Sequence, residues 1–334
     1  MSTLDSAVAT PSAGERFRAW LGTVVRAREF GIFAFLIIIS VLIGIARPTF
    51  IARNNLFNML RQMSEVAIMA FAMTFLITSQ ELDLSVGSIY GLTSFTMALL
   101  ALVLGVSLWV GLAVAIVMAI AIGIINGLIT TKGRIPAFIT TLGMLYILRG
   151  LALLMSPWPV SGIEGNQLFY AVFAGQWHNI SIQVLWMFFF AIVGWLVMTR
   201  TTFGYYVRAT GSNNAAARLS GVGVNRIKVI GFILTALAAL FAGVLSFAHL
   251  GSVAPTAGAG MELKVIAAVV IGGTALFGGE GTIIGTLLGA ALLTVVRNGL
   301  VQIGGEGRLQ EAFLGAIIIF AVLIHTHLRT SNRR

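Results

Sequence analysis

The chain has 334 residues, of which 58% are apolar and only 10% are charged, with a formal net charge of +10 and no cysteine. A soluble fold of this length would need far more surface charge, and the lack of cysteine excludes disulfides, thiolate catalysis and Cys-based metal sites. Long apolar runs separated by basic segments indicate an all-α integral membrane protein. The basic excess then sets orientation and contacts anionic lipid, and it does not indicate nucleic-acid binding.

The apolar runs predict about ten transmembrane helices between a polar tail, residues 1–29, and a short second tail, residues 329–334. The helices are expected at residues 30–46, 64–79, 85–104, 106–129, 137–154, 180–199, 229–248, 263–277, 282–301 and 312–328. Basic residues gather in both tails and in the loop 200–228, so both termini are predicted to be cytoplasmic. The transmembrane domain is therefore expected to span residues 30–328.

Two stretches are predicted to lie at the membrane surface. Arg53–Arg61 places Leu56, Phe57 and Leu60 on one helical face, as an interfacial helix does. The outward loop 156–179 contains tryptophan and proline residues that suit the membrane boundary. We interpret this loop as an interfacial anchor, and the alternative is a docking surface for a partner.

Two of the expected spans, 64–79 and 263–277, are short. At 1.5 Å per residue they reach about 24 Å and 22 Å, against a hydrocarbon core of about 30 Å. Each is followed by a polar or glycine-rich stretch, residues 80–88 and 277–282. Interrupted spans of this kind often line a transport route, and the alternative is two tight turns between ordinary helices.

Polar side chains near membrane depth are candidates for a translocation path, because buried charge in lipid is costly. The candidates are Glu81, Asp83, Ser85, Asn126, Glu262 and Asn298. A structural role is the alternative for several of them. Asp83 can cap the helix expected at 85–104, and the asparagines can form hydrogen bonds between helices.

Glycines at four-residue spacing indicate close helix packing. Gly281, Gly285 and Gly289 would form one smooth helical face that lets another backbone approach. This pattern concerns packing and carries no information on a substrate.

The most basic internal stretch is Arg200–Lys228, which contains five basic residues and no acidic one. Ser212 and Asn213 can cap a short helix, and Gly221 and Gly223 are natural stops. The pattern predicts a short, basic, small-faced helix on the membrane surface. The alternative is an ordinary positive loop that only sets orientation.

No catalytic or nucleotide-binding motif is present in the sequence. None of the three lysines follows a glycine and precedes serine or threonine as a Walker A pattern requires, so this chain is not expected to bind ATP. The four histidines are scattered, which argues against a metal site. No arrangement of nucleophile and base stands out, so we expect neither a catalytic residue nor a cofactor in this chain.

Four blocks in order resemble the ribose-type ABC transporter permeases, the membrane subunits of bacterial monosaccharide importers. The blocks begin with ELDLSVGS at Glu81, KGR at Lys132, GSNNAAARLSG at Gly211 and PTAG at Pro255. The likeness extends from about residue 50 to the C-terminus. It implies a multi-pass permease of the bacterial inner membrane with about ten spans.

The resemblance also implies the partners of the chain. These are separate ATP-binding subunits that hold ATP and magnesium, a periplasmic sugar-binding protein, and a second copy or a related permease. It identifies the loop 200–228 with the helix that docks on the ATPase and couples it to transport. The implied coupling residues are Asn213, Asn214, Ala215, Ala216, Arg218, Leu219, Ser220 and Gly221, with Asn214 where ribose permeases tend to have Glu.

Other functions remain as alternatives at this stage. A permease of the same superfamily could carry an amino acid, a nucleoside or autoinducer-2. An ion-coupled secondary transporter could use Asp83 and Glu262, although it would need no basic docking helix. A structural or signalling membrane protein is the third possibility.

Overall fold

The structure is a computed structural model that describes residues 28–304 except 179, together with 312, 315 and 316. Residues 1–27 of the first tail, the whole second tail and most of the tenth expected span, 312–328, lie outside the described residues. Within them, eight helices are long and apolar enough to cross a membrane. These are α2 (Arg28–Ala46), α3 (Arg53–Thr78), α4 (Val86–Leu104), α5 (Leu108–Thr131), α6 (Ala137–Met155), α8 (Ile182–Arg200), α11 (Val224–Leu250) and α13 (Ile283–Gln302).

Shorter elements connect these spans. The helices among them are η1 (Pro48–Ile51), α7 (Gln167–Ala174), α9 (Thr202–Ser212), α10 (Asn214–Leu219) and α12 (Met261–Ile271). Four two-residue strands form two antiparallel pairs: β1 (Val160–Ser161) with β4 (Ser252–Val253), and β2 (Gln176–Trp177) with β3 (Ile180–Ser181). The predicted all-α membrane fold is therefore confirmed.

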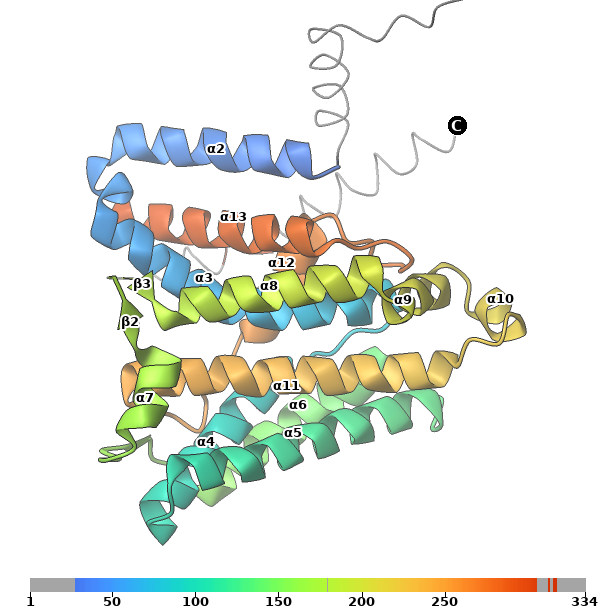
Figure 1. Ribbon diagram of the computed structural model, residues 1–334, viewed down its shortest axis with the longest axis horizontal. Helices are drawn as coiled ribbons and strands as arrows, with labels where there is room; N and C mark the ends of the chain where they lie inside the picture. Colours follow the sequence, from blue (N-terminus) through green and yellow to red (C-terminus); the bar gives the residue numbers. More distant parts are fainter. Residues whose placement is uncertain (1–27, 179, 305–311, 313–314, 317–334) are drawn as a thin grey trace, which may run out of the picture.

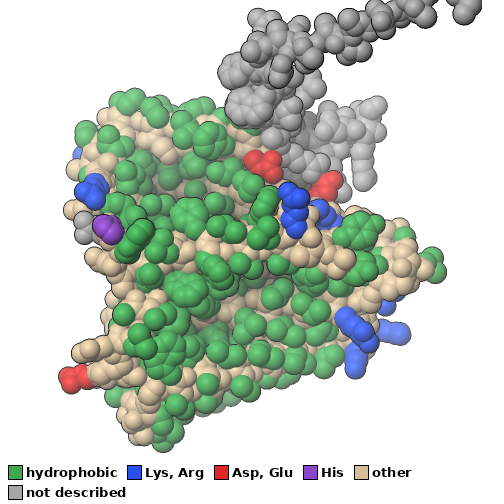
Figure 2. Space-filling model, in the orientation of Figure 1, with side chains coloured by type: hydrophobic (Ala, Val, Ile, Leu, Met, Phe, Trp, Pro, Cys, Tyr) green, Lys and Arg blue, Asp and Glu red, His purple; other side chains and the backbone are tan. Residues whose placement is uncertain are grey.

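The helices form one bundle in which α3, α4 and α11 are the most buried spans (Figure 1). The surrounding helices α2, α5, α6 and α8 expose large apolar side chains, among them Ile45, Val117, Leu154 and Ile192. Figure 2 shows hydrophobic side chains across the middle of one face of the molecule. This is the surface that lipid tails require.

Basic residues mark one end of the bundle. The end formed by α9 and α10 carries exposed Arg200, Arg218 and Arg226, and the turn between α5 and α6 exposes Lys132 and Arg134. Most of the Lys and Arg side chains visible in Figure 2 lie toward this end, opposite α7, β2 and β3. The positive-inside rule therefore assigns the α9–α10 end to the cytoplasm and the α7 end to the outside.

The prediction of a short span at residues 64–79 is wrong. The expected surface helix 53–61 and the span 64–79 form one continuous helix, α3, of 26 residues. At 1.5 Å per residue it is about 39 Å long, which exceeds the hydrocarbon core. Gln62 and Met63, which join the two parts, are good helix formers, so nothing interrupts the helix there.

The second short span is confirmed and is shorter than expected. Helix α12 has 11 residues, about 16 Å, and ends at Ile271 and not at residue 277. It ends because Gly273 takes a positive φ of 86°, which suits glycine. Non-helical segments, residues 251–260 and 272–282, flank α12 on both sides.

Close packing against α13 supports the broken span. A Cβ on Gly289 would overlap the Ala268 carbonyl of α12, and a Cβ on Gly285 would overlap the Gly272 carbonyl. Gly285 and Gly289 of α13 therefore let α12 and the following loop lie directly against the helix backbone. The prediction that Gly281 shares this helical face is wrong, because α13 begins only at Ile283. Thr282 caps α13, because its side chain accepts a hydrogen bond from Gly285 N.

We predict that Gly289→Leu destabilises the protein by about 1–3 kcal/mol or more, because the side chain has no space between α12 and α13. The measurement is the thermal unfolding midpoint of the detergent-solubilised protein. Gly143→Leu is the matched control, because a Cβ at Gly143 in α6 meets no atom within 4 Å. Equal midpoints for the two variants would contradict the packing argument.

Candidate functional site

The cytoplasmic loop contains two helices where one was expected. Thr201 caps α9, and the Asn213 side chain accepts a hydrogen bond of 3.0 Å from Ala216 N and so caps α10, as predicted. Ser212 is the last residue of α9 and does not cap α10. Gly221, with a positive φ of 82°, follows α10 and agrees with the predicted stop.

The solvent-exposed face of α10 consists mainly of small side chains and carries a single charged residue. Ala215, Ala216 and Ser220 are exposed, and Leu219 has 91% of its surface exposed. Arg218 donates a hydrogen bond of 2.6 Å to Asn225 Oδ1, which ties α10 to the start of α11. An apolar side chain this exposed at the cytoplasmic end is suited to insertion into a protein partner.

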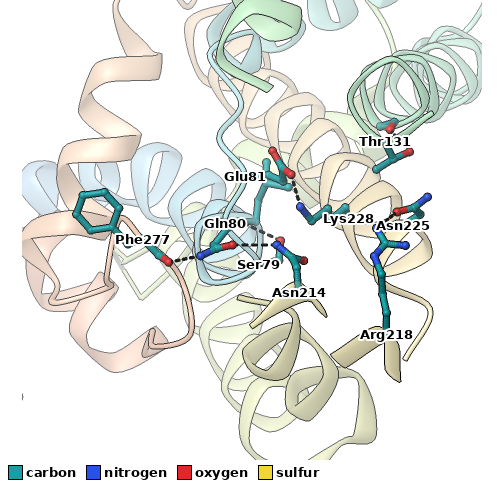
Figure 3. Close-up of polar contacts among 11 residues, drawn as sticks. Ser79, Gln80, Glu81, Thr131, Asn214, Arg218, Asn225, Lys228 and Phe277 are labelled. Carbon is teal, nitrogen blue, oxygen red and sulfur yellow. Dashed lines mark hydrogen bonds and ion pairs between the residues drawn. The ribbon is translucent and has the colours of Figure 1, made fainter. Parts of the chain in front are cut away.

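Gln80 links this loop to two other segments (Figure 3). Its Nε2 donates a hydrogen bond of 2.7 Å to the Phe277 carbonyl, and its Oε1 accepts one of 2.9 Å from Asn214 Nδ2. Gln80 also adopts a positive φ of 66°, which is uncommon for a residue with a side chain. The backbone is held in this conformation where the end of α3, the start of α10 and the loop after α12 meet.

Backbone contacts bring the same segments together. Gly279 N donates a hydrogen bond of 2.9 Å to the Thr78 carbonyl at the end of α3. Gly211 of α9 lies against both groups so closely that a Cβ would overlap them. We call the set Thr78, Gln80, Gly211, Asn214, Phe277 and Gly279 the inner junction.

An ion pair attaches α11 beside the inner junction. Lys228 Nζ lies 2.5 Å from Glu81 Oε1, and the two side chains are only 13% and 12% exposed. Figure 3 shows this pair beside the Gln80 contacts. Hydrogen bonds join α10 to Gln80 after α3, to α11 and, through Gln80, to the 272–282 loop.

Asp83 lies in a separate buried cluster. Its Oδ1 accepts hydrogen bonds from Ser85 N at 2.8 Å and from Ser85 Oγ at 2.5 Å. Asn126 Nδ2 of α5 donates to Ser85 Oγ at 2.9 Å. These bonds go to the residue that precedes α4 and not to an amide inside it, so the expectation that Asp83 caps this helix needs correction.

The structure does not bring the six path candidates together. Glu81 lies beside the inner junction in its ion pair with Lys228, whereas Asp83, Ser85 and Asn126 form the cluster between α4 and α5. Glu262 accepts a hydrogen bond of 3.3 Å from Gly260 N at the start of α12. Asn298 forms a reciprocal amide pair with Asn55, at 2.9 Å and 3.0 Å, which joins α13 to α3.

Sequence reasoning missed Gln80 and Glu65. No local pattern marks Gln80, because its partners lie 134 and 197 residues away in the chain. Glu65 did have a signal, since it is the one charged residue in the expected span 64–79.

The comparisons with known proteins agree with this architecture. Residues 55–322 match the family described as branched-chain amino acid transport system / permease component. The ribose import permease protein RbsC of Escherichia coli is 39% identical over 319 residues, which cover 93% of this chain and 97% of the relative. No solved structure matches the chain.

Two further relatives are similar over most of their length. The ribose import permease protein RbsC of Bacillus subtilis is 37% identical over 298 residues, covering 89% of this chain and 92% of the relative. The L-arabinose transport system permease protein AraH of Escherichia coli is 32% identical over 305 residues, covering 91% and 92%.

We predict that Gln80→Ala and Asn214→Ala each destabilise the protein by about 1 kcal/mol, because each leaves a hydrogen-bonding group of the inner junction without its partner. Their effects should not add, since both remove the same bond. The thermal midpoints of the two single variants and the double variant measure this coupling. Full additivity would mean that the bond does not link α10 to α3.

Proposed function

Since the chain belongs to the branched-chain amino acid transport system / permease component family, we propose that it forms the passage of an ATP-driven monosaccharide importer. The chain is a multi-pass membrane protein and a permease subunit of a transport system. Our proposal adds the identity of its solute and of its partner subunits. We propose the bacterial inner membrane as its location.

The names of the relatives support a sugar as the solute. Three relatives, two ribose permeases and one L-arabinose permease, are similar over about nine-tenths of this chain. Both sugars are neutral five-carbon monosaccharides. We therefore propose a monosaccharide of this class, delivered to the outer end by a periplasmic binding protein.

The geometry of α10 is the observation that carries the coupling role. The helix is short, its exposed face is small, and Leu219 projects from it at the cytoplasmic end. We propose that Asn213–Gly221 docks on a separate subunit that binds ATP and magnesium. A second permease, either another copy or a related chain, would complete the passage.

The inner junction supports a route from ATP to the spans. Closure of the ATPase pair would move α10, and Asn214 would transfer that movement to Gln80 at the end of α3. The Lys228–Glu81 pair would move α11 with it. The interrupted span around α12 is the element best suited to rearrange, because its flanking segments have no helical hydrogen bonds to break.

An uptake assay tests the proposed function. Cells with and without this chain are given labelled D-ribose, L-arabinose and other monosaccharides, with ATP present or depleted. We expect the deletion to abolish ATP-dependent uptake of one sugar. Uptake that survives ATP depletion and collapses with the ion gradient would instead identify a secondary transporter.

A branched-chain amino acid is the second candidate solute, because the family description names that class. Labelled leucine and valine therefore belong in the same assay. Loss of their uptake, with sugar uptake unchanged, would favour this alternative.

We predict that Ala216→Trp and Leu219→Asp abolish uptake while the protein remains in the membrane. The first adds bulk to the docking face, and the second places a charge where an apolar pocket of the partner would lie. Co-purification of the ATPase subunit with the tagged permease measures docking directly.

Leu154→Trp is the matched control for this prediction. Leu154 is 83% exposed, similar to Leu219, but it lies at the outer end of α6. Normal uptake in Ala216→Trp and Leu219→Asp would rule out the coupling role of α10.

A further inference from the structure

The outer part of α3 carries a polar face that nothing in the proposed coupling route uses. Polar side chains recur there at intervals of three or four residues and so share one side of the helix. They are Asn54, Asn58, Arg61, Gln62 and Glu65. Asn54, Asn58 and Gln62 are exposed, and Arg61 and Glu65 are half-buried. We call this set the polar face of α3.

Three other helices contribute side chains beside it. The Tyr90 hydroxyl of α4, a residue only 6% exposed, donates a hydrogen bond of 3.1 Å to Glu65 Oε2. Ser246 of α11 and Lys264 of α12 also interact with Glu65. Residues from α3, α4, α11 and α12 therefore converge on one carboxylate.

Arg61 connects this group to the end of α11. Its charge acts on Glu65 and also on His249, which is exposed one residue before α11 ends. Glu65 lies about 18 Å along the helix from Arg53, at 1.5 Å per residue. The polar group thus extends from the outer end of the bundle well into the depth of the membrane.

Lipid cannot be the neighbour of such a face. Charged and amide side chains at this depth require water, protein or a polar solute around them. Among the described residues of α3, Leu56 is the only large apolar side chain that is exposed. Most of the exposed large apolar side chains lie on α2, α5, α6 and α8 instead.

The chemistry of the group suits a neutral solute with many hydroxyls. The amides of Asn54, Asn58 and Gln62 each offer both donors and an acceptor. The charged members carry both signs, since the positive charges of Arg61 and Lys264 both act on the Glu65 carboxylate. An ionic solute would be better served by an excess of one sign.

We propose that the polar face of α3, with Tyr90, Ser246 and Lys264, lines the outer half of the passage and hydrogen-bonds a polyhydroxylated neutral solute. This proposal rests on the proposed function for the identity of the solute. The location of the aqueous wall can be tested without it.

Thiol accessibility in intact cells tests the location, because the natural chain contains no cysteine. Asn58→Cys and Gln62→Cys are produced in the full chain with its partner subunits. They are treated from outside with a membrane-impermeant thiosulfonate reagent that carries a sulfonate group. We expect both to react about tenfold or more faster than the lipid-facing controls, because only a hydrated thiol ionises readily.

Val117→Cys and Ile192→Cys are the matched controls. These positions are 68% and 58% exposed in the single chain, but they lie on the apolar surfaces of α5 and α8. Addition of the binding protein loaded with D-ribose should slow the reaction at Gln62→Cys. That protection is the expected sign of solute in contact with the wall.

Two results would overturn the proposal. Slow reaction of Gln62→Cys, equal to the controls, would place the face away from water. Disulfide formation between two copies through Gln62→Cys, without any reaction with the impermeant reagent, would assign the face to a closed subunit interface.

The uptake assay separates this proposal from the proposed function. Normal ATP-dependent sugar uptake together with an unreactive Gln62→Cys would reject the wall alone. Monosaccharide import would be rejected if the chain supports no ATP-dependent sugar uptake while Gln62→Cys is labelled rapidly. The aqueous wall would then still stand. Labelling without protection by D-ribose, in cells that import it, would reject the solute contact.

Discussion

Backbone polar groups at membrane depth must find partners inside the protein, because lipid offers none. This chain meets that constraint while leaving three segments non-helical: residues 79–85, 251–260 and 272–282. Each segment lies among small residues that let backbones approach. The Gly279–Thr78 hydrogen bond and the contacts of Gly285 and Gly289 show how the last segment is accommodated.

The same non-helical segments leave backbone polar groups available to bind side chains from other parts of the chain. A continuous helix pairs its own carbonyls, whereas the unwound segment at Phe277 leaves a carbonyl free for Gln80. Gln80 in turn accepts from Asn214. Hydrogen bonds thereby join the docking helix α10 to the transmembrane core, in addition to its covalent connections along the chain.

Helix α3 connects the two polar regions of the molecule. Its cytoplasmic end enters the inner junction at Thr78, and its outer half carries the polar face that includes Gln62 and Glu65. Because a helix is stiff along its axis, a displacement at one end reaches the other without local unfolding. The proposed coupling at α10 and the proposed passage wall would therefore act through a single element about 39 Å long.

The sequence by itself determined the membrane class, most spans, the Asn213 cap of α10 and the family, because hydropathy, capping and motif order are local properties of the chain. It did not determine that residues 53–61 continue into a span, since a polar helix face has the same periodicity at a membrane surface as beside a passage. Nor did it indicate the partners of Gln80, Glu65 or Asn298. Those contacts depend on how helices far apart in the chain are rotated and packed, and only the tertiary structure decides which side chains then face each other, face lipid or face water.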